Sequence, residues 1–140
     1  MEESAAASAR EAELDRIAAF RAELRRFLLR SNSVAVEAGL TSQRCDLMLA
    51  IRSAGEVRIT ELCGLLQLEQ TAVTRLVKRA EAAGLVQRRV SDEDGRVWLV
   101  RLTEAGEQLL LHLSTKLRAE TEALSAALRL VDARLQAVGR

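Results

Sequence analysis

A change of hydrophobic period at Gly84 is the feature that most constrains what this chain can fold into. On one face of residues 70–83, apolar side chains recur at helical spacing: Val73, Leu76, Val77 and Ala80. After Gly84 the pattern changes to the period of two that is typical of half-buried strands. One set of alternating side chains comprises Val86, Arg88 and Val90 in the first strand and Trp98, Val100 and Leu102 in the second, and the other set comprises Gln87, Arg89, Val97, Leu99 and Arg101. Gly84 favours a helix end because it adopts the left-handed backbone conformation without a steric cost. The stretch therefore predicts a helix followed by a two-stranded ribbon.

The residues around this stretch complete a recognisable arrangement. A shorter helix, capped by Thr60, is predicted just upstream, and residues 57–59 can add a third strand. The polar residues 91–95 predict a turn between the two longer strands. Glu69 stands where Ser, Thr or Asp usually caps a helix, so we expect a weak start for the second helix. Helix, turn, helix and ribbon together predict a winged helix-turn-helix.

The outer face of the second helix carries small polar and cationic side chains: Thr71, Thr74, Arg75, Lys78 and Arg79. Such a face suits a duplex groove, because cations bind phosphates, Arg can grip guanine through two hydrogen bonds and Thr can pack on a thymine methyl group. Arg96 lies beside the turn of the ribbon, where its cation can enter a narrow minor groove. Winged helices also serve as protein–protein interaction modules, and the charge pattern alone favours neither function.

Positive charge is concentrated in the same stretch. The whole chain has a formal net charge of +1, whereas residues 70–102 hold seven Lys or Arg and four acidic residues, a net charge of +3. This is the electrostatic footprint expected of a duplex-binding surface. The chain has no Tyr, one Trp and two Phe, which argues against the aromatic platforms that bind single strands.

Long helices are predicted on both sides of this region, and the absence of Pro favours them. The first runs from Glu11 to Gly39, after residues 1–9 that are expected to fray. Its mainly apolar stripe comprises Leu14, Ile17, Phe20 or Arg21, Leu24, Phe27 or Leu28, and Val34 or Ala35. Thr103 is predicted to cap the last helix, whose near-heptad stripe comprises Leu110, Leu113, Leu117, Thr121, Leu124, Leu128, Val131, Leu135 and Val138. So long a stripe needs cover from the first helix, a second subunit or both. A homodimer is favoured, because two-fold proteins bind two-fold sites.

One more helix, capped by Thr41 or Ser42 and closed by Gly55, completes the predicted fold, with a mostly buried set of Cys45, Leu47, Met48, Leu49 and Ile51. The fold class is mainly α with a small β wing: a winged helix-turn-helix flanked by long N- and C-terminal dimerisation helices. We expect an N-terminal arm over 1–40, a DNA-binding lobe over 41–102 and a C-terminal dimerisation helix over 103–140, in one intertwined domain.

This order of elements, and two motifs, resemble the MarR family of bacterial transcription regulators over about residues 10–138. The motifs are VTRLVKRAEAAGLVQRR, which includes the reading helix, and DEDGRVWLVRLTEAGEQL, which includes the wing tip and the entry to the last helix. The resemblance implies a homodimeric regulator, expected to be a repressor, that binds a pseudo-palindromic operator in double-stranded DNA. The reading helix, residues 70–83, would lie in the major groove and the wing, residues 86–102, in the minor groove. A small aromatic or phenolic effector is a further implied partner.

The resemblance also implies individual contacts. Gln70, Thr71, Thr74, Arg75 and Lys78 match positions that contact bases or phosphates. Arg96 matches the wing-tip Arg, and Asp94 matches an acidic wing position that orients a neighbouring Arg. Arg79 and Arg89 complete the predicted DNA-binding set.

Nothing in the sequence predicts catalysis, a cofactor or a metal site, since there is no P-loop, no dinucleotide fingerprint and a single histidine, His112. Cys45 and Cys63 are expected to be small buried side chains, with a thiol-based redox-sensing regulator as the open alternative. Trp98 is expected to be a hydrophobic anchor of the wing. Because no signal peptide or membrane-spanning run is recognisable, a cytoplasmic protein without a membrane partner is expected.

Overall fold

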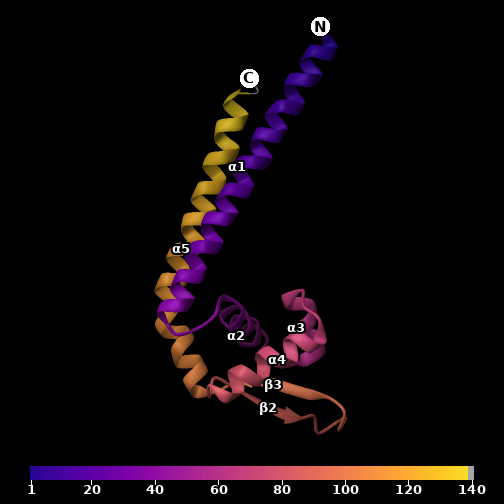
Figure 1. Ribbon diagram of the computed structural model, residues 1–140, viewed down its shortest axis with the longest axis vertical. Helices are drawn as coiled ribbons and strands as arrows, with labels where there is room; N and C mark the ends of the chain where they lie inside the picture. Colours follow the sequence, from indigo (N-terminus) through magenta and orange to yellow (C-terminus); the bar gives the residue numbers. More distant parts are fainter. Residues whose placement is uncertain (139–140) are drawn as a thin grey trace. The chain divides into compact units, whose positions relative to one another are not determined.

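The computed structural model describes residues 1–138, and its elements follow the predicted order (Figure 1): α1 (Glu2–Glu37), α2 (Ser42–Ala54), β1 (Glu56–Arg58), α3 (Ile59–Leu66), α4 (Gln70–Ala82), β2 (Val86–Val90), β3 (Trp98–Leu102) and α5 (Glu104–Val138). The chain forms two compact units. One comprises residues 1–34 with the C-terminal segment from Thr115, and the other comprises residues 35–114. Within the described residues, no helix is both long and apolar enough to cross a membrane.

The unit of residues 35–114 is built on a three-stranded antiparallel sheet in the order β1-β3-β2. Helices α2, α3 and α4 supply most of the remaining core, whose fully buried side chains include Leu47, Ile51, Val57, Leu62, Val73, Val77, Val86 and Val100. Every member of the apolar face predicted for the reading helix is 8% exposed or less: Val73, Leu76, Val77 and Ala80. The predicted winged helix-turn-helix is therefore confirmed.

Several predicted helix ends are also confirmed. The Thr41 hydroxyl accepts a hydrogen bond from the Arg44 backbone N–H at 3.1 Å, and the Thr103 hydroxyl accepts one from the Gly106 N–H at 3.1 Å. Gly84, directly after α4, has a φ of 75°, the left-handed conformation that glycine adopts without strain. Glu69 occupies the N-cap of α4 without a side-chain hydrogen bond, as its residue type predicted.

Two predicted helix starts are wrong. Helix α1 begins at Glu2 rather than at Glu11, because its first residues are rich in Ala and Glu, which favour a helix even without a buried face. Thr60 does not cap α3, since the N-cap is Arg58, which makes no side-chain capping bond. Helix α3 starts at Ile59, two residues before the Glu61 start that a Thr60 cap would give, which places Ile59 and Leu62 one turn apart in the core.

Two burial predictions are also wrong. Leu49 is 41% exposed, because Leu47, Met48 and Ile51 occupy the face of α2 that meets the core. Trp98 is 44% exposed and is not a buried anchor, because it pairs with Val90 at the outer end of the hairpin, beyond the buried Val100.

In the other unit, the Arg16 guanidinium pairs with the Asp132 carboxylate at 3.0 Å and joins α1 to α5. The half-buried side chains of α1 in this unit are at Ala12, Ala19, Ala22, Glu23, Phe27, Ser31 and Val34. Of the predicted stripe, Phe27 and Val34 are half-buried and Ala35 is buried, whereas Leu14, Ile17, Phe20, Leu24 and Leu28 are exposed. On α5, Leu117, Leu124, Leu128 and Val131 are half-buried, and the side chains of Leu135 and Val138 lie outside those that the structure describes.

Candidate nucleic-acid interface

Because the apolar face of α4 is buried, its opposite face is turned to solvent. Five predicted contact residues line one shallow hollow on this face, here called the helix hollow: Gln70, Thr71, Thr74, Arg75 and Lys78. Arg75 and Lys78 are exposed, so their cations are available to a ligand. The structure therefore brings together Gln70 and four of the five small polar and cationic side chains predicted for the outer face of this helix, but not Arg79.

A second hollow lies between α4, the start of α3 and the wing, and is here called the wing hollow. It shares Gln70, Thr74 and Lys78 with the helix hollow, and its other lining residues are Arg58, Ile59, Thr60, Arg88, Arg96, Val97 and Trp98. Arg96 of the wing thus faces the same groove as the polar residues of α4. One surface carries both the reading helix and the wing tip.

The loop at the wing tip is held by its own backbone. One Asp94 carboxylate oxygen accepts a hydrogen bond from the Arg96 N–H at 3.0 Å, and the Asp94 carbonyl accepts one from the Val97 N–H at 3.0 Å. The Ser91 N–H donates to the Val97 carbonyl at 2.8 Å, which closes the loop. The Asp94 carboxylate therefore orients the backbone of Arg96 rather than its guanidinium. The direction of the Arg96 side chain depends on the position of the wing.

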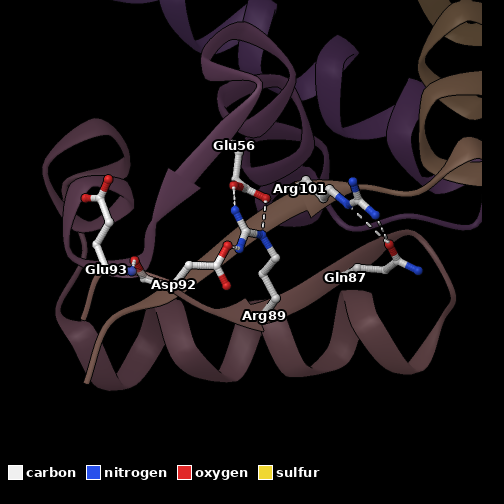
Figure 2. Close-up of polar contacts among 7 residues, drawn as sticks. Glu56, Gln87, Arg89, Asp92, Glu93 and Arg101 are labelled. Carbon is white, nitrogen blue, oxygen red and sulfur yellow. Dashed lines mark hydrogen bonds and ion pairs between the residues drawn. The ribbon is translucent and has the colours of Figure 1, made fainter. Parts of the chain in front are cut away.

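Arg89 belongs to a different cluster, on the outer face of the sheet (Figure 2). Its guanidinium donates to the two Glu56 carboxylate oxygens at 2.9 and 2.6 Å, and it also contacts Asp92 at 3.4 Å. The hydrogen bonds from Arg89 lower the pKa of the Glu56 carboxyl, and the same bonds raise the pKa of Arg89. Because Glu56 is on β1 and Arg89 is on β2, the pair ties the two outer strands together across β3.

Arg79 and Arg89 line neither hollow. Arg79 is exposed on α4, and the Arg89 side chain is already engaged by two carboxylates. Sequence reasoning in turn missed Arg58, Thr60, Arg88 and Trp98, which all line the wing hollow. Arg58 could have been predicted from the sequence, because it directly precedes the first helix of the helix-turn-helix, where a cation lies near the start of that motif.

Neither cysteine lines the helix hollow or the wing hollow. Cys45 is 5% exposed in the core, and the Cys63 thiol is half-buried and donates to the Ile59 carbonyl at 3.4 Å. This matches the expectation of small packed side chains. Among the described residues, no group of three His, Cys, Asp or Glu side chains is placed to hold a metal ion.

Comparison with known proteins yields a family match and two related bacterial proteins. Residues 38–97 match the model of the MarR family. The chain is 36% identical to YdgJ of Bacillus subtilis, an uncharacterized HTH-type transcriptional regulator, over 70 residues. This aligned segment covers 50% of this chain and 43% of that protein. It is 35% identical over 91 residues to YwoH of the same organism, with the same description, covering 65% of this chain and 66% of that protein. The matched segments span less than two thirds of the length of either relative.

Two solved structures share the fold. A mutant of MarR from E. coli, complexed with operator DNA, aligns with a TM-score of 0.65 and 23% identity over 84% of this chain and 89% of that chain. NadR in complex with 4-hydroxyphenylacetate aligns with a TM-score of 0.68 and 20% identity over 83% of this chain and 86% of that chain. At these identities the alignments establish a common fold.

Proposed function

This chain belongs to the MarR family of winged helix-turn-helix transcriptional regulators, and on that premise we propose that it acts as a homodimeric, sequence-specific DNA-binding repressor. Helix α4 reads the major groove of an operator, while the wing formed by β2 and β3 enters the adjacent minor groove. The observation that carries this proposal is the shared surface of the two hollows. Gln70, Thr74 and Lys78 line both, so that α4 and Arg96 contact one ligand rather than two.

The chemistry of the two hollows suits duplex DNA. Lys78 and Arg96 supply phosphate-binding cations on either side of the groove, and Arg75 supplies a guanidinium that can pair with a guanine edge. Asp94 acts on the wing-tip backbone rather than on DNA. Arg79 and Arg89 are proposed as peripheral phosphate contacts. The related MarR that is complexed with operator DNA supports the same use of this fold.

A dimer follows from what a single chain leaves uncovered. The stripe of α1, from Leu14 to Leu28, is exposed over five large apolar side chains, and a second copy of the chain would cover it. Two-fold symmetry then sets the two reading helices about one helical turn, roughly 34–36 Å, apart and requires a pseudo-palindromic operator. A DNA target inside the cell makes the cytoplasm the proposed location.

Response to a small aromatic or phenolic effector is a separate proposal. It is supported by NadR, which shares the fold and is solved with 4-hydroxyphenylacetate. Such an effector changes DNA affinity only if it binds one arrangement of the two lobes better than the other. Because the chain has one Trp, two Phe and no Tyr, apolar and cationic side chains would have to supply most of its contacts.

A gel-shift titration on the upstream region of the chain's own gene, at two salt concentrations, tests the DNA-binding proposal. We expect tighter binding to that region than to random duplex, and weaker binding to both at the higher salt concentration, because phosphate contacts release counterions. Equal affinity for the two duplexes would remove sequence-specific recognition. No binding to either would favour a protein–protein interaction module.

A further inference from the structure

Three side chains connect the reading helix to the wing on the inner face of the sheet, here called the clamp: Glu81 of α4, Arg88 of β2 and Trp98 of β3. The Arg88 Nε lies 3.2 Å from both Glu81 carboxylate oxygens, and its Nη2 lies 3.0 Å from Oε1. The Arg88 backbone N–H donates to the same carboxylate at 3.2 Å. The guanidinium carbon of Arg88 lies 5.2 Å from the centroid of the Trp98 ring. One guanidinium is therefore held by a carboxylate and by an aromatic face.

The strand register explains how the clamp reaches both elements. Arg88 is paired with Val100, and Trp98 with Val90, so these side chains lie on one face of the hairpin and Arg88 is a diagonal neighbour of Trp98. The buried rungs of the hairpin end at Val100, and beyond them Val90 is 39% and Trp98 44% exposed. The outer half of the wing therefore has little apolar core to fix its angle against α4.

Arg96 lies two residues before Trp98 in the chain, on the side of the wing tip, and it lines the wing hollow together with Trp98 and Arg88. Any rotation of the hairpin around its base would move Arg96 relative to Thr74 and Lys78 on the opposite wall of that hollow. We propose that the clamp of Glu81, Arg88 and Trp98 positions the wing so that Arg96 and the reading helix engage the same duplex at once. Glu81 and Trp98 are thus positioning residues for DNA recognition, and this role rests on the proposed function.

The charge of Glu81 and its positioning role predict opposite changes in DNA affinity when Glu81 is replaced. Glu81 is an anion beside a surface that binds a polyanion, so removing its charge alone should strengthen DNA binding. A positioning role predicts the opposite, because a wing that is no longer held must be ordered when the duplex binds. Glu93 is the matched control, since it is an exposed acid on the same wing that lies outside the clamp.

The first measurement compares Glu81→Ala with Glu93→Ala in the full-length chain. Trp98 is the only tryptophan, so its fluorescence reports the clamp directly. In free protein, quenching of Trp98 by acrylamide should increase in Glu81→Ala and stay unchanged in Glu93→Ala. Affinity for the chain's own upstream duplex should fall about twofold to tenfold in Glu81→Ala and stay equal or rise in Glu93→Ala. Unchanged quenching, or tighter DNA binding by Glu81→Ala, would overturn the positioning role.

The second measurement separates positioning from general loss of stability. Arg96→Ala should cost much less affinity in the Glu81→Ala background than in the wild type, whereas the cost of Arg75→Ala should be the same in both. Trp98→Leu provides a second background with the same expectation. Additive losses for Arg96 would overturn the positioning role and leave the proposed function intact. A wild-type protein without specific DNA binding would overturn the proposed function, and the positioning role with it.

Discussion

Arg75 is the residue from which the sequence preference of this surface is expected to come. It lines the helix hollow between two threonine side chains and Lys78, and its exposed guanidinium can make two parallel hydrogen bonds to guanine. Lys78 and Arg79 are expected to bind phosphates, which are the same for every sequence. Different residues of α4 should therefore determine sequence specificity and overall affinity.

Replacing Arg75 with Ala should weaken binding to the operator by about 1–3 kcal/mol more than it weakens binding to random duplex. The matched control is Arg79→Ala, which removes the same charge from the same helix but lies outside both hollows. It should weaken both duplexes to a similar, smaller extent. Fluorescence anisotropy with the two labelled duplexes measures the difference, and equal losses for Arg75→Ala would make Arg75 a phosphate contact only.

Glu56 gives the wing a predictable response to pH. Its hydrogen bonds with Arg89 lower its pKa in the folded state below the ordinary value of 4.5. The stabilisation is therefore present above that ordinary value and is lost as the pH falls through the lowered pKa. Glu56→Gln should lower the Tm slightly at pH 7, and the difference from the wild type should shrink and vanish as the pH falls through the lowered pKa of Glu56.

Thermal unfolding followed by circular dichroism across this pH range measures the effect of Glu56. Glu93→Gln is the control, because Glu93 is an exposed acid on the same wing and its substitution should change the Tm equally little at every pH. A Tm difference for Glu56→Gln that persists at low pH would show that the pair with Arg89 is not its source.

At the scale of elements, the junction of β2 and α5 depends on one glycine. A Cβ on Gly106 would lie 2.2 Å from the Leu85 carbonyl oxygen, a backbone atom that also accepts a hydrogen bond from the Thr103 N–H at 3.0 Å. Neither partner can move without disturbing the start of both elements. Gly106→Ala should therefore lower the free energy of unfolding by about 1–3 kcal/mol.

Gly64 is the matched control for Gly106, because it lies in α3 with open space where its Cβ would be. Gly64→Ala should raise the free energy of unfolding by about 0.5–1 kcal/mol, since Ala loses less backbone entropy than Gly in a helix. Guanidinium unfolding followed by Trp98 fluorescence measures both variants. A Gly106→Ala protein as stable as the wild type would show that the junction relaxes around the methyl group.

Sequence predicted the elements better than it predicted their contacts. The period of two in residues 85–90 and 97–102 was enough for the hairpin, because one face of it packs on the core at Val86 and Val100. The clamp was not predictable, since it depends on how the hairpin twists toward Glu81 of α4. The cap predicted at Thr60 was wrong for a related reason. Thr60 favours the N-cap by residue type, but the helix starts at Ile59, whose side chain is buried in the core.

At the scale of the whole molecule, the distribution of burial on α1 separates two kinds of surface. Its half-buried positions, such as Ala19 and Phe27, are used within the unit that contains α5, where Arg16 pairs with Asp132. Most of the other large apolar side chains of α1 are turned to solvent, with Leu14 65%, Ile17 45% and Leu24 36% exposed. Because water-exposed apolar stripes of this length mark association surfaces, a second copy of the chain is the expected cover.

Replacing Ile17 and Leu24 together with Glu should therefore convert the proposed dimer to a monomer, because it would place two charges in an apolar interface. A monomer holds only one half-site, so operator affinity should fall about 10²–10⁴-fold through lost avidity. The fold of residues 35–114 should persist, since neither substitution lies in that unit. Sedimentation equilibrium measures the mass, and anisotropy on a full operator and on a single half-site measures the two affinities.

The control for this last prediction adds the same two charges outside the stripe, by Ala18→Glu and Ser33→Glu, both at exposed positions of α1. This control should remain dimeric and bind the full operator like the wild type. Half-site affinity should be similar in all three proteins, because the contacts of each reading helix are unchanged. If the Ile17 and Leu24 variant stayed dimeric with full operator affinity, two-fold recognition would have to depend on a surface other than this stripe.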